Sequence, residues 1–448
     1  MKMRSSREQR AWYFYDWANS GYVTTTGTVL FGPYLTSVAK DAAGCTGDGV
    51  CAERLHLLGI PIAPGSLFFY TVTFATLFSA FLLPVLGAIV DRRGDKRRML
   101  GLFAWIGAIA ASLMFFVSDG HWMLGAVLLM VANIGLGGSL VVYDAILIDI
   151  ARPDDRDRVS SRGWAFGYAG GGLLLIINLL MVLMPGVFGV DKELAVRLSL
   201  LSAGLWWAGW TIIPFRRIID RPLRGLPPTA DSAFIAGAFR QLLRTLRDLR
   251  MYRHTAMFLA AYLFFNDGVQ TVIASASVFG AEQLAMSQEI LIGAIVVVQI
   301  VAFAGALLFG RRAAKRGAVH TIRESLVVWI VAVAAGYFLP VGNVGLFFGI
   351  AAVFGTVLGG IQALSRSLFS QLVPRGREAE YFSLYQACER GTSWLGTLIF
   401  GLVHQWTGSY RPAILSLIAF FVIGGFLLSK VDVRAGITAA GNELPAVV

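Results

Sequence analysis

The 448-residue chain has few charged residues and few cysteines. Asp, Glu, Lys and Arg make up 15% of it, whereas about a quarter is typical of soluble domains. Three cysteines are too few for a small secreted fold held together by disulfides. The five histidines are scattered, with no spacing that matches a zinc site. These absences exclude a soluble globular domain and a disulfide-rich scaffold, and we expect no metal and no cofactor.

Hydrophobic residues, in contrast, make up 56% of the chain, which also excludes disorder. They are concentrated in runs of about 20 residues, the length at which an α-helix crosses ~30 Å of hydrocarbon. Twelve such runs are expected, at roughly 11–39, 66–90, 99–118, 122–149, 163–185, 196–215, 255–281, 289–310, 324–341, 343–368, 380–405 and 411–430. The pattern predicts an all-α integral membrane protein with twelve transmembrane helices.

Lys and Arg are unevenly divided between the two sides of the predicted membrane. The net charge is +11, but the basic residues lie in short clusters between apolar runs, so we expect no nucleic-acid partner. With a cytoplasmic N-terminus, five of the 38 Lys and Arg lie in outer segments: Lys40, Arg54, Lys192, Arg197 and Arg411. Because inner loops collect positive charge, we predict that both termini are cytoplasmic.

The first hydrophobic run could be a removed signal peptide, and the first outer loop could contain a disulfide. The start, MKMRSSREQR, is basic, but the run after it is long and contains Asp16, so we expect it to remain as a helix rather than to be a removed signal peptide. Cys45 and Cys51 share the first outer loop, on the oxidising side. They either form a disulfide or remain two free thiols.

A basic stretch, residues 216–253, separates six predicted spans from the other six. Apolar residues recur in it at helical spacing with four arginines among them. One interpretation is a linker followed by an amphipathic helix on the anionic inner leaflet, and the other is an extension of the seventh span. The expected organisation is an N-terminal half at 1–215, this linker, a C-terminal half at 254–430 and a cytoplasmic tail at 431–448.

The two halves repeat each other in register, as in transporters that arose by duplication of a six-helix unit. NSGYVT at 19–24 in the first span parallels NDGVQT at 266–271 in the seventh. GAIVDRRG at 87–94 parallels GRRAAKRG at 310–317, and a third match precedes the fifth and eleventh spans. We therefore predict two pseudo-symmetric six-helix bundles.

The stretch GAIVDRRGDKRR at 87–98 resembles the signature of the major facilitator superfamily in this inner loop. The resemblance implies the fold of that superfamily and transport by alternating access. It makes Asp91 and Arg92 candidate gating residues. The Asp91 carboxylate can approach the positive N-terminal end of a helix in the other half, whereas the arginines could instead anchor the topology.

Longer segments in both halves resemble bacterial relatives of the fungal vacuolar amino-acid effluxers linked to autophagy. They are WYFYDWANSGY at 12–22, RVSSRGWAFGYAGGGLLL at 158–175, NDG at 266–268 and GGIQALSRSLFSQLVPRGREAEYFSLY at 359–385. The resemblance implies efflux of an amino acid or a similar small metabolite, and a location in a bacterial inner membrane. It also implies a basic residue at Arg390, whereas Glu389 and Asp144 depart from the family pattern.

Ionisable side chains within the predicted spans are candidates for transport, because a charge in hydrocarbon needs a partner or a cavity. Asp267 lies near the bilayer centre and is the predicted proton-coupling residue, together with Glu389. The alternative for Asp267 is an ion pair with Arg390 or a hydrogen-bonded packing role. Arg390 keeps its charge, so we expect it to bind a substrate carboxylate through two hydrogen bonds.

Four further charges lie toward the inner ends of the spans and form the predicted inner gate: Asp16, Asp144, Asp149 and Arg366. We expect Asp149 or Asp144 to pair with Arg366 across the two halves, with ordinary interfacial solvation as the alternative. For Asp16 the alternative is an interfacial aromatic belt. Uncharged polar residues complete the predicted substrate site: Asn19, Ser20, Thr24, Asn266, Gln270, Gln362 and Gln386. The alternative for each is an interhelical hydrogen bond.

The sequence therefore predicts a secondary transporter that moves a small polar solute by alternating access, coupled to protons. No phosphate-binding loop and no catalytic constellation is visible, so an ion gradient is expected to drive transport and no enzymatic activity is predicted. The expected partners are the lipid bilayer, a small-molecule substrate and protons, and the expected state is a monomer. The alternatives are a lipid-translocating or scrambling protein of this fold, or a non-transporting membrane sensor.

Overall fold

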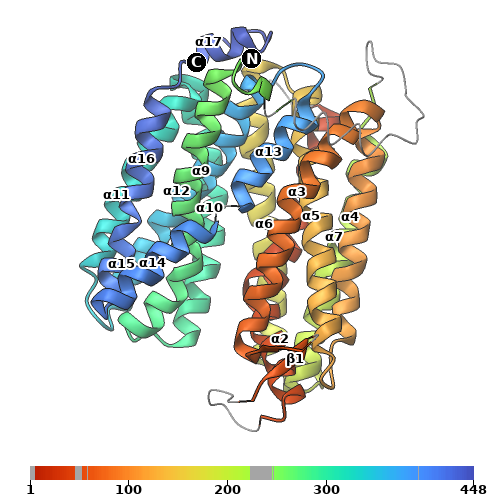
Figure 1. Cartoon of the computed structure of the whole chain (residues 1–448), viewed down its shortest axis with the longest axis vertical. Coiled ribbons are helices and arrows are strands. Elements are labelled where there is room, and N and C mark those ends of the chain that lie inside the picture. The colour runs from red at the N-terminus through yellow and green to blue at the C-terminus, as the bar shows by residue number, and fades with distance from the viewer. Residues whose placement is uncertain (1–5, 46–52, 58, 222–244, 246, 392) are drawn as a thin grey trace.

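A computed structural model describes residues 6–45, 53–57, 59–221, 245, 247–391 and 393–448. The helices of the N-terminal bundle are α1 (Arg7–Gly21), α2 (Phe31–Ala42), α3 (Leu67–Arg93), α4 (Lys96–Leu113), α5 (Trp122–Ile150), α6 (Arg156–Leu183) and α7 (Lys192–Arg217). Those of the C-terminal bundle are α9 (Arg253–Val278), α10 (Gln288–Arg316), α11 (Ala318–Tyr337), α12 (Val344–Leu372), α13 (Glu378–Gly391), α14 (Ser393–Thr407), α15 (Tyr410–Ser416) and α16 (Ile418–Ser429), followed by α17 (Val433–Ala439). Figure 1 shows the two bundles side by side.

Short elements connect or extend these helices. Wide π-helical turns form η1 (Tyr22–Leu30), which joins α1 to α2, and η6 (Phe279–Gln283), which follows α9. Short 3-10 turns are η2 (Pro64–Ser66), η3 (Met114–Phe116), η4 (Pro153–Asp155) and η5 (Pro185–Phe188). A small antiparallel hairpin of β1 (Leu55–Leu57) and β2 (Ile60–Ile62) lies between α2 and α3.

Ten helical segments of the described chain are long and apolar enough to cross a membrane. The two other predicted spans are the first and the eleventh. The first is helical from α1 through α2 but carries charged and polar residues in its first turns. The eleventh is described as α13 and α14, on either side of residue 392, which lies outside the described residues; each of the two is shorter than a span, and α13 is strongly polar. Both predicted spans are thus helical over their described residues: polarity separates the first from the other ten, and the short described lengths of α13 and α14 separate the eleventh.

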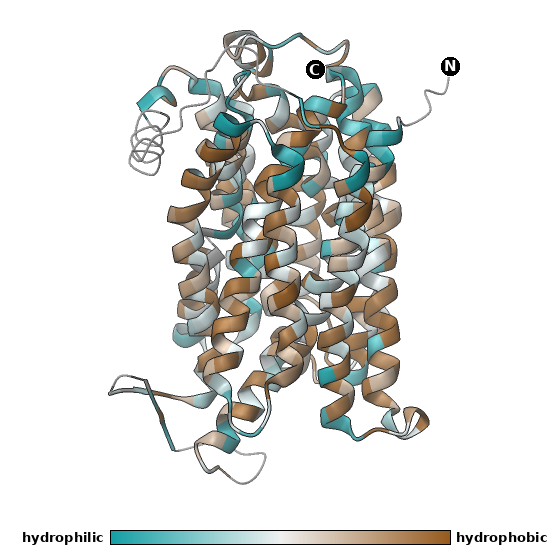
Figure 2. Cartoon of the chain, turned by 90° about the vertical axis from the view of Figure 1, so that its right-hand side faces the viewer, coloured by the Kyte–Doolittle hydropathy of each residue, from teal (hydrophilic) through white to brown (hydrophobic). Residues whose placement is uncertain are grey.

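The outer surfaces of the bundles are apolar, as expected for helices in lipid. Large side chains such as Phe69, Phe81 and Val331 are exposed. Figure 2 shows hydrophobic residues along the length of the helices and hydrophilic ones gathered at one end. Inside the bundles, helices approach closely at small residues, and a Cβ on Gly135 would lie 2.8 Å from the Cα of Gly107.

Both termini lie at the same end of the molecule, which we call the terminal face (Figure 1). The tail after α16 folds across this face. The side-chain amide of Asn442 donates to the carbonyls of Gln371 and Val373, both at 2.8 Å. The backbone N–H of Ala446 donates to Asp154 in the N-terminal bundle at 2.6 Å. The tail therefore contacts both bundles.

Two predictions fall on the parts outside the described residues. The proposed amphipathic helix lies mostly within residues 222–244, and its two interpretations stay open. Cys45 is disulfide-bonded, and its expected partner, Cys51, lies outside the described residues.

Candidate functional site

Arg366, on α12, lies where the two bundles meet near the terminal face. Its guanidinium forms ion pairs with Asp16 on α1 and Asp144 on α5, at N–O distances of 3.2 and 3.3 Å. It also donates to the hydroxyl and carbonyl oxygens of Ser160 on α6, at 3.0 and 3.1 Å. The Arg366 side chain is 3% exposed. All four acceptor groups belong to the N-terminal bundle, so this buried cation joins the two bundles.

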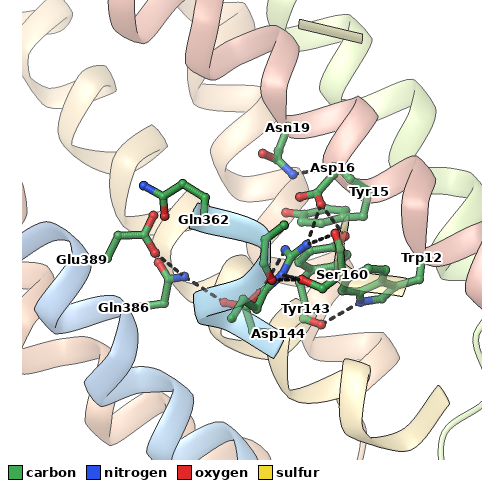
Figure 3. Close-up of polar contacts among 12 residues, drawn as sticks. Trp12, Tyr15, Asp16, Asn19, Tyr143, Asp144, Ser160, Gln362, Gln386 and Glu389 are labelled. Atoms are coloured by element: carbon green, nitrogen blue, oxygen red, sulfur yellow. Dashed lines mark hydrogen bonds and ion pairs between the residues drawn. The ribbon is translucent and has the colours of Figure 1, made fainter. Parts of the chain in front are cut away.

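Three aromatic rings of the N-terminal bundle surround the same guanidinium. Its central carbon lies 4.8, 5.2 and 5.4 Å from the ring centroids of Trp12, Tyr143 and Trp164. Rings at this range attract a cation through their negative faces. We call the two carboxylates, the three rings and Ser160 the Arg366 cage. Figure 3 shows its residues Trp12, Asp16, Tyr143, Asp144 and Ser160.

Hydrogen bonds within the N-terminal bundle hold the cage together. The hydroxyl of Tyr143 donates to the Asp16 carboxylate at 2.7 Å. The indole N–H of Trp12 donates to the backbone carbonyl of Tyr143 at 2.8 Å, and the two rings stack with centroids 4.2 Å apart. The shape of the cage therefore depends on contacts that do not involve Arg366.

The structure selects between the two acids predicted to pair with Arg366. Asp144 forms that pair, and Asp16 joins it. The alternative pairing of Arg366 with Asp149 is wrong, because Asp149 instead pairs with Lys96 at the start of α4, at 2.9 Å. Asp149 lies five residues beyond Asp144, or about 7.5 Å of helix rise nearer the helix end, which places it beside α4.

A chain of polar contacts continues from the cage into the C-terminal bundle (Figure 3). The side-chain amide of Gln386, on α13, donates to Asp144 at 2.9 Å and to Glu389 at 3.2 Å. Arg390 donates to the side-chain oxygen of Gln386 at 3.3 Å. Gln386 thus links one acid of the cage to the two charged residues that follow it on α13.

A second polar group lies beside this chain, between α9, α12 and α13. The amide of Gln362 donates to the side-chain oxygen of Asn266 at 3.0 Å. Asn266 in turn donates to the backbone carbonyl of Glu389 at 3.2 Å. The structure therefore brings together five of the residues predicted for substrate binding and coupling: Asn266, Gln362, Gln386, Glu389 and Arg390.

The remaining residues of the predicted substrate site have other surroundings. Asn19 donates to the carbonyl of Tyr15 within its own helix, at 2.7 Å. Ser20 is half-buried against α6, since a Cβ on Gly167 would lie 2.8 Å from its hydroxyl oxygen. Gln270 is half-buried on α9, and no hydrogen bond joins it to the cage among the described residues.

Thr24 makes a contact between the bundles that the sequence did not single out. It lies in η1, and its hydroxyl accepts a hydrogen bond from Gln299 on α10 at 3.0 Å. Wide π-helical turns such as η1 are frequent at functional sites. The polar residues that recur in the first and seventh spans identified Thr24 as a candidate site residue. Its hydrogen-bond partner, Gln299, is known only from the structure.

Asp267 lies on α9 and is fully buried against α14. One carboxylate oxygen accepts a hydrogen bond from the backbone N–H of Gly396 at 3.0 Å. The other has no hydrogen-bond partner among the described residues, and neither has the nearby hydroxyl of Thr271. No ion pair joins Asp267 to Arg390 within the described chain, so proton coupling and hydrogen-bonded packing are the two roles left for this carboxylate.

Asp91 lies at the end of α3 and contacts the first turn of α13. Its carboxylate accepts hydrogen bonds from the backbone N–H groups of Ala379 and Glu380, at 3.0 and 2.8 Å. This is the approach to a helix N-terminus that the signature motif suggested. Gly94 ends α3 with φ +70°, a conformation that favours glycine, and Arg92 is half-buried beside Asp91.

Arg377 supports the same turn from the loop before α13. It forms ion pairs with Glu380 and Asp248, both at 3.0 Å, and contacts Thr245. Burial disfavours its charge, but the hydrogen bond and charge of Glu380 outweigh this and raise the pKa of Arg377. The segment that enters α9 is thereby attached to the start of α13.

Comparisons with known proteins agree with this architecture. The family described as "Vacuole effluxer Atg22 like" matches residues 4–441. The chain is 30% identical to the uncharacterized MFS-type transporter YxiO of Bacillus subtilis (strain 168), over 99% of this chain and 100% of that protein. It is 26% identical to Autophagy-related protein 22 of Pyricularia oryzae, over 99% of this chain and 78% of that protein.

Solved structures of transporters show the same fold. The human organic anion transporter MFSD10 superposes with a TM-score of 0.66 at 15% identity, covering 94% of this chain and 99% of that one. FucP, a major facilitator transporter in the outward conformation, superposes with a TM-score of 0.64 at 12% identity, covering 94% and 97%. The protein is thus an integral membrane secondary transporter with a small-molecule substrate rather than an enzyme. The chain belongs to the Vacuole effluxer Atg22 like family and has the all-α major facilitator fold of two pseudo-symmetric six-helix bundles.

Proposed function

We propose that the protein exports an amino acid or a related carboxylate-bearing metabolite across a bacterial inner membrane, coupled to protons. It works as a monomer by alternating access, and the terminal face is cytoplasmic. The observation that carries the proposal is the chain of buried polar contacts from Arg366 through Asp144 and Gln386 to Glu389 and Arg390. Ionisable groups at membrane depth are costly, are held by partners such as these, and typically mark the path of a polar substrate or ion.

The chemistry of the contacts between the bundles supports alternating access. At the terminal face they include ion pairs and hydrogen bonds, namely the Arg366 cage and the contact of Asp91 with α13. Polar contacts of this kind can be exchanged for water when the bundles rock apart. In this proposal they form the inner gate, to which Asp149 and Arg92 contribute through the neighbouring ends of α5 and α3.

The C-terminal bundle supplies the groups that fit a zwitterion. The guanidinium of Arg390 can bind a carboxylate through two hydrogen bonds, and the acids joined through Gln386, Glu389 and Asp144, can accept from an ammonium group. Asn266, Gln362 and Gln386 supply uncharged donors and acceptors beside them. Asn19, Ser20, Thr24 and Gln270 complete the proposed site, and Thr24 reaches α10 through Gln299.

Asp267 is the proposed proton-coupling residue, together with Glu389. Its counterpart in the first repeat is Ser20, which packs against a glycine of α6 as Asp267 packs against Gly396 of α14. The helix contact made by Asp267 therefore does not need a carboxylate, because an uncharged serine makes the corresponding contact in the N-terminal bundle. This supports a role for the Asp267 carboxylate in coupling rather than in packing.

Flux in proteoliposomes tests the proposal. Purified protein is screened for thermal stabilisation by a panel of amino acids, carboxylates and amines, and each stabilising compound is followed into vesicles with and without a pH gradient. Solute flux that the gradient accelerates is the expected result. Lipid scrambling without solute flux, or binding without any flux, would contradict it and favour the scramblase or the sensor.

A further inference from the structure

Arg366 belongs to the C-terminal bundle, but the groups that hold it belong to the N-terminal bundle. We propose that the Arg366 cage is the binding site for a guanidinium or primary ammonium group of the transported solute. Arg366 fills the cage while the terminal face is closed, and the solute fills it when that face opens. This inference rests on the proposed function and deepens it, because it names the chemical group that the solute must carry.

The cage has the composition of a site for an organic cation. Two carboxylates, of Asp16 and Asp144, lie on the guanidinium, and their side chains are 8% and 2% exposed. The rings of Trp12, Tyr143 and Trp164 face it at 4.8–5.4 Å. Carboxylates accept charge-assisted hydrogen bonds from a cation, and aromatic faces attract it without needing its protons.

The cage is complete without the C-terminal bundle. Trp12 and Asp16 come from α1, Tyr143 and Asp144 from α5, and Ser160 and Trp164 from α6. The bonds from Tyr143 to Asp16 and from Trp12 to Tyr143 stay within this bundle. Movement of α12 away from α6 therefore removes Arg366 but leaves the acids and rings in place.

Removing Arg366 leaves two carboxylates close together among aromatic rings without a cation. Breaking a buried ion pair by removing one partner is strongly unfavourable, because the remaining charge is uncompensated. A cationic solute from the aqueous phase compensates both carboxylates. Because it binds the open state and not the closed one, it shifts the equilibrium between them toward the open state. Arg366 and the solute then compete for one site, and the closed state re-forms when the solute leaves it.

The contacts of Gln386 indicate how one solute could use both bundles. Gln386 bridges Asp144 of the cage at 2.9 Å and Arg390 at 3.3 Å. A solute with a positive group in the cage and a carboxylate at Arg390 would span the same interval. An amino acid has both groups, and a diamine has only the first.

The cage is tested directly by removing the Arg366 side chain and adding a small guanidinium compound that can take its place and restore thermal stability. The full chain with Arg366→Ala is purified in detergent, and its thermal unfolding is followed with methylguanidinium chloride or with sodium chloride at equal ionic strength. We expect methylguanidinium to raise the Tm by about 3 °C at a concentration well above its dissociation constant. The rise should be several-fold smaller in the wild type, in which Arg366 competes for the cage, and it should be reduced by at least half in the double variant Asp144→Asn, Arg366→Ala.

Arg156→Ala is the matched control, because Arg156 crosses the same boundary in the opposite direction. It donates from α6 to the carbonyl of Ser370 at 2.8 Å and to the side-chain oxygen of Gln371 at 3.2 Å, both uncharged acceptors on α12. No rescue is expected there. Equal rescue of Arg156→Ala and Arg366→Ala, or no rescue of a folded Arg366→Ala, would overturn the inference.

A second variant keeps the test decisive if Arg366→Ala does not fold. Asp91→Asn retains Arg366 and weakens the contact with α13, so the cage should be vacated more often. Agmatine should then stabilise Asp91→Asn at several-fold lower concentration than it stabilises the wild type, and pentanamide should stabilise neither. Agmatine binding to neither protein, or equal effects of agmatine and pentanamide, would overturn the inference.

These binding measurements need neither flux nor a gradient, so the two proposals can fail separately. Rescue of Arg366→Ala without flux in proteoliposomes would contradict the proposed transport and leave the cage as a cation site. Equal flux of solutes with and without a cationic group would contradict the inference and leave the proposed transport intact.

Discussion

The Asp91 carboxylate accepts a 2.8 Å hydrogen bond from the backbone N–H of Glu380, although 289 residues separate the two in sequence. The contact places a negative side chain at the N-terminal end of a helix in the other bundle, where it accepts from buried N–H groups that have no partner within their own helix. It therefore contributes to the free energy that keeps the terminal face closed.

Asp91→Asn should shift the protein toward the state that is open at the terminal face. Asparagine keeps one acceptor oxygen but loses the negative charge, which costs the closed state about 1 kcal/mol. A cysteine at Ser370, which is buried in the closed state, should then react faster with a water-soluble maleimide, in a background without Cys388. Asp95→Asn is the control, because its partner Arg98 is largely exposed. Equal labelling rates in both variants would contradict a closing role for Asp91.

Arg366→Gln should lower the free energy of unfolding by about 3 kcal/mol, because it leaves two buried carboxylates without their cation. Adding Asp144→Asn to the same chain should recover part of that loss, since it removes one of the unpaired charges. Reversible thermal or denaturant unfolding in detergent measures both effects. Strictly additive losses in the double variant would show that Arg366 and Asp144 are not energetically coupled.

Asp267→Asn should abolish gradient-driven flux but spare exchange of labelled for unlabelled solute. The substituted side chain cannot carry a proton, whereas it can still accept from the backbone of Gly396. Ser20→Ala, at the equivalent place in the first repeat, can change solute affinity but should leave the ratio of gradient-driven to undriven flux unchanged. Driven flux that survives unchanged in Asp267→Asn would contradict the coupling role.

Arg390→Gln should weaken binding of carboxylate-bearing solutes by about tenfold to a hundredfold, the effect of losing a charge-assisted pair of hydrogen bonds. Solutes without a carboxylate should be affected little. Thermal-shift titrations with an amino acid and with its amide give the two dissociation constants. An equal loss for both ligands would indicate that Arg390 holds Gln386 and α13 in place instead.

The fold was predictable because hydrophobic length and charge asymmetry are properties of the sequence itself. The sequence repeat also showed that α5 and α12 occupy equivalent places in the two halves. From this the ion pair of Asp144 with Arg366 could be predicted as one of two options. It could not decide between Asp144 and Asp149, because both lie near the same helix end. That choice depends on the position of Lys96, which reaches Asp149 from the neighbouring helix.

The aromatic part of the site was not predictable in the same way. Trp12 and Trp164 lie in segments that resemble known transporters, but bulky rings are common throughout these spans. Which rings face Arg366 is fixed by how α1, α5 and α6 rotate about their axes on packing. The pairing of Thr24 with Gln299 was hidden for the same reason, because the two come from helices in different bundles.

The central claim is that Arg366 closes the terminal face and that vacating its cage opens it. Spin labels at two exposed positions of that face, Arg98 on α4 and Lys315 on α10, measure the separation of the bundles in a background without Cys388. We predict a short distance in the wild type and a longer population in Arg366→Ala. We also predict that population in the wild type when a transported cationic solute is added. One unchanged distance under all three conditions would contradict the account.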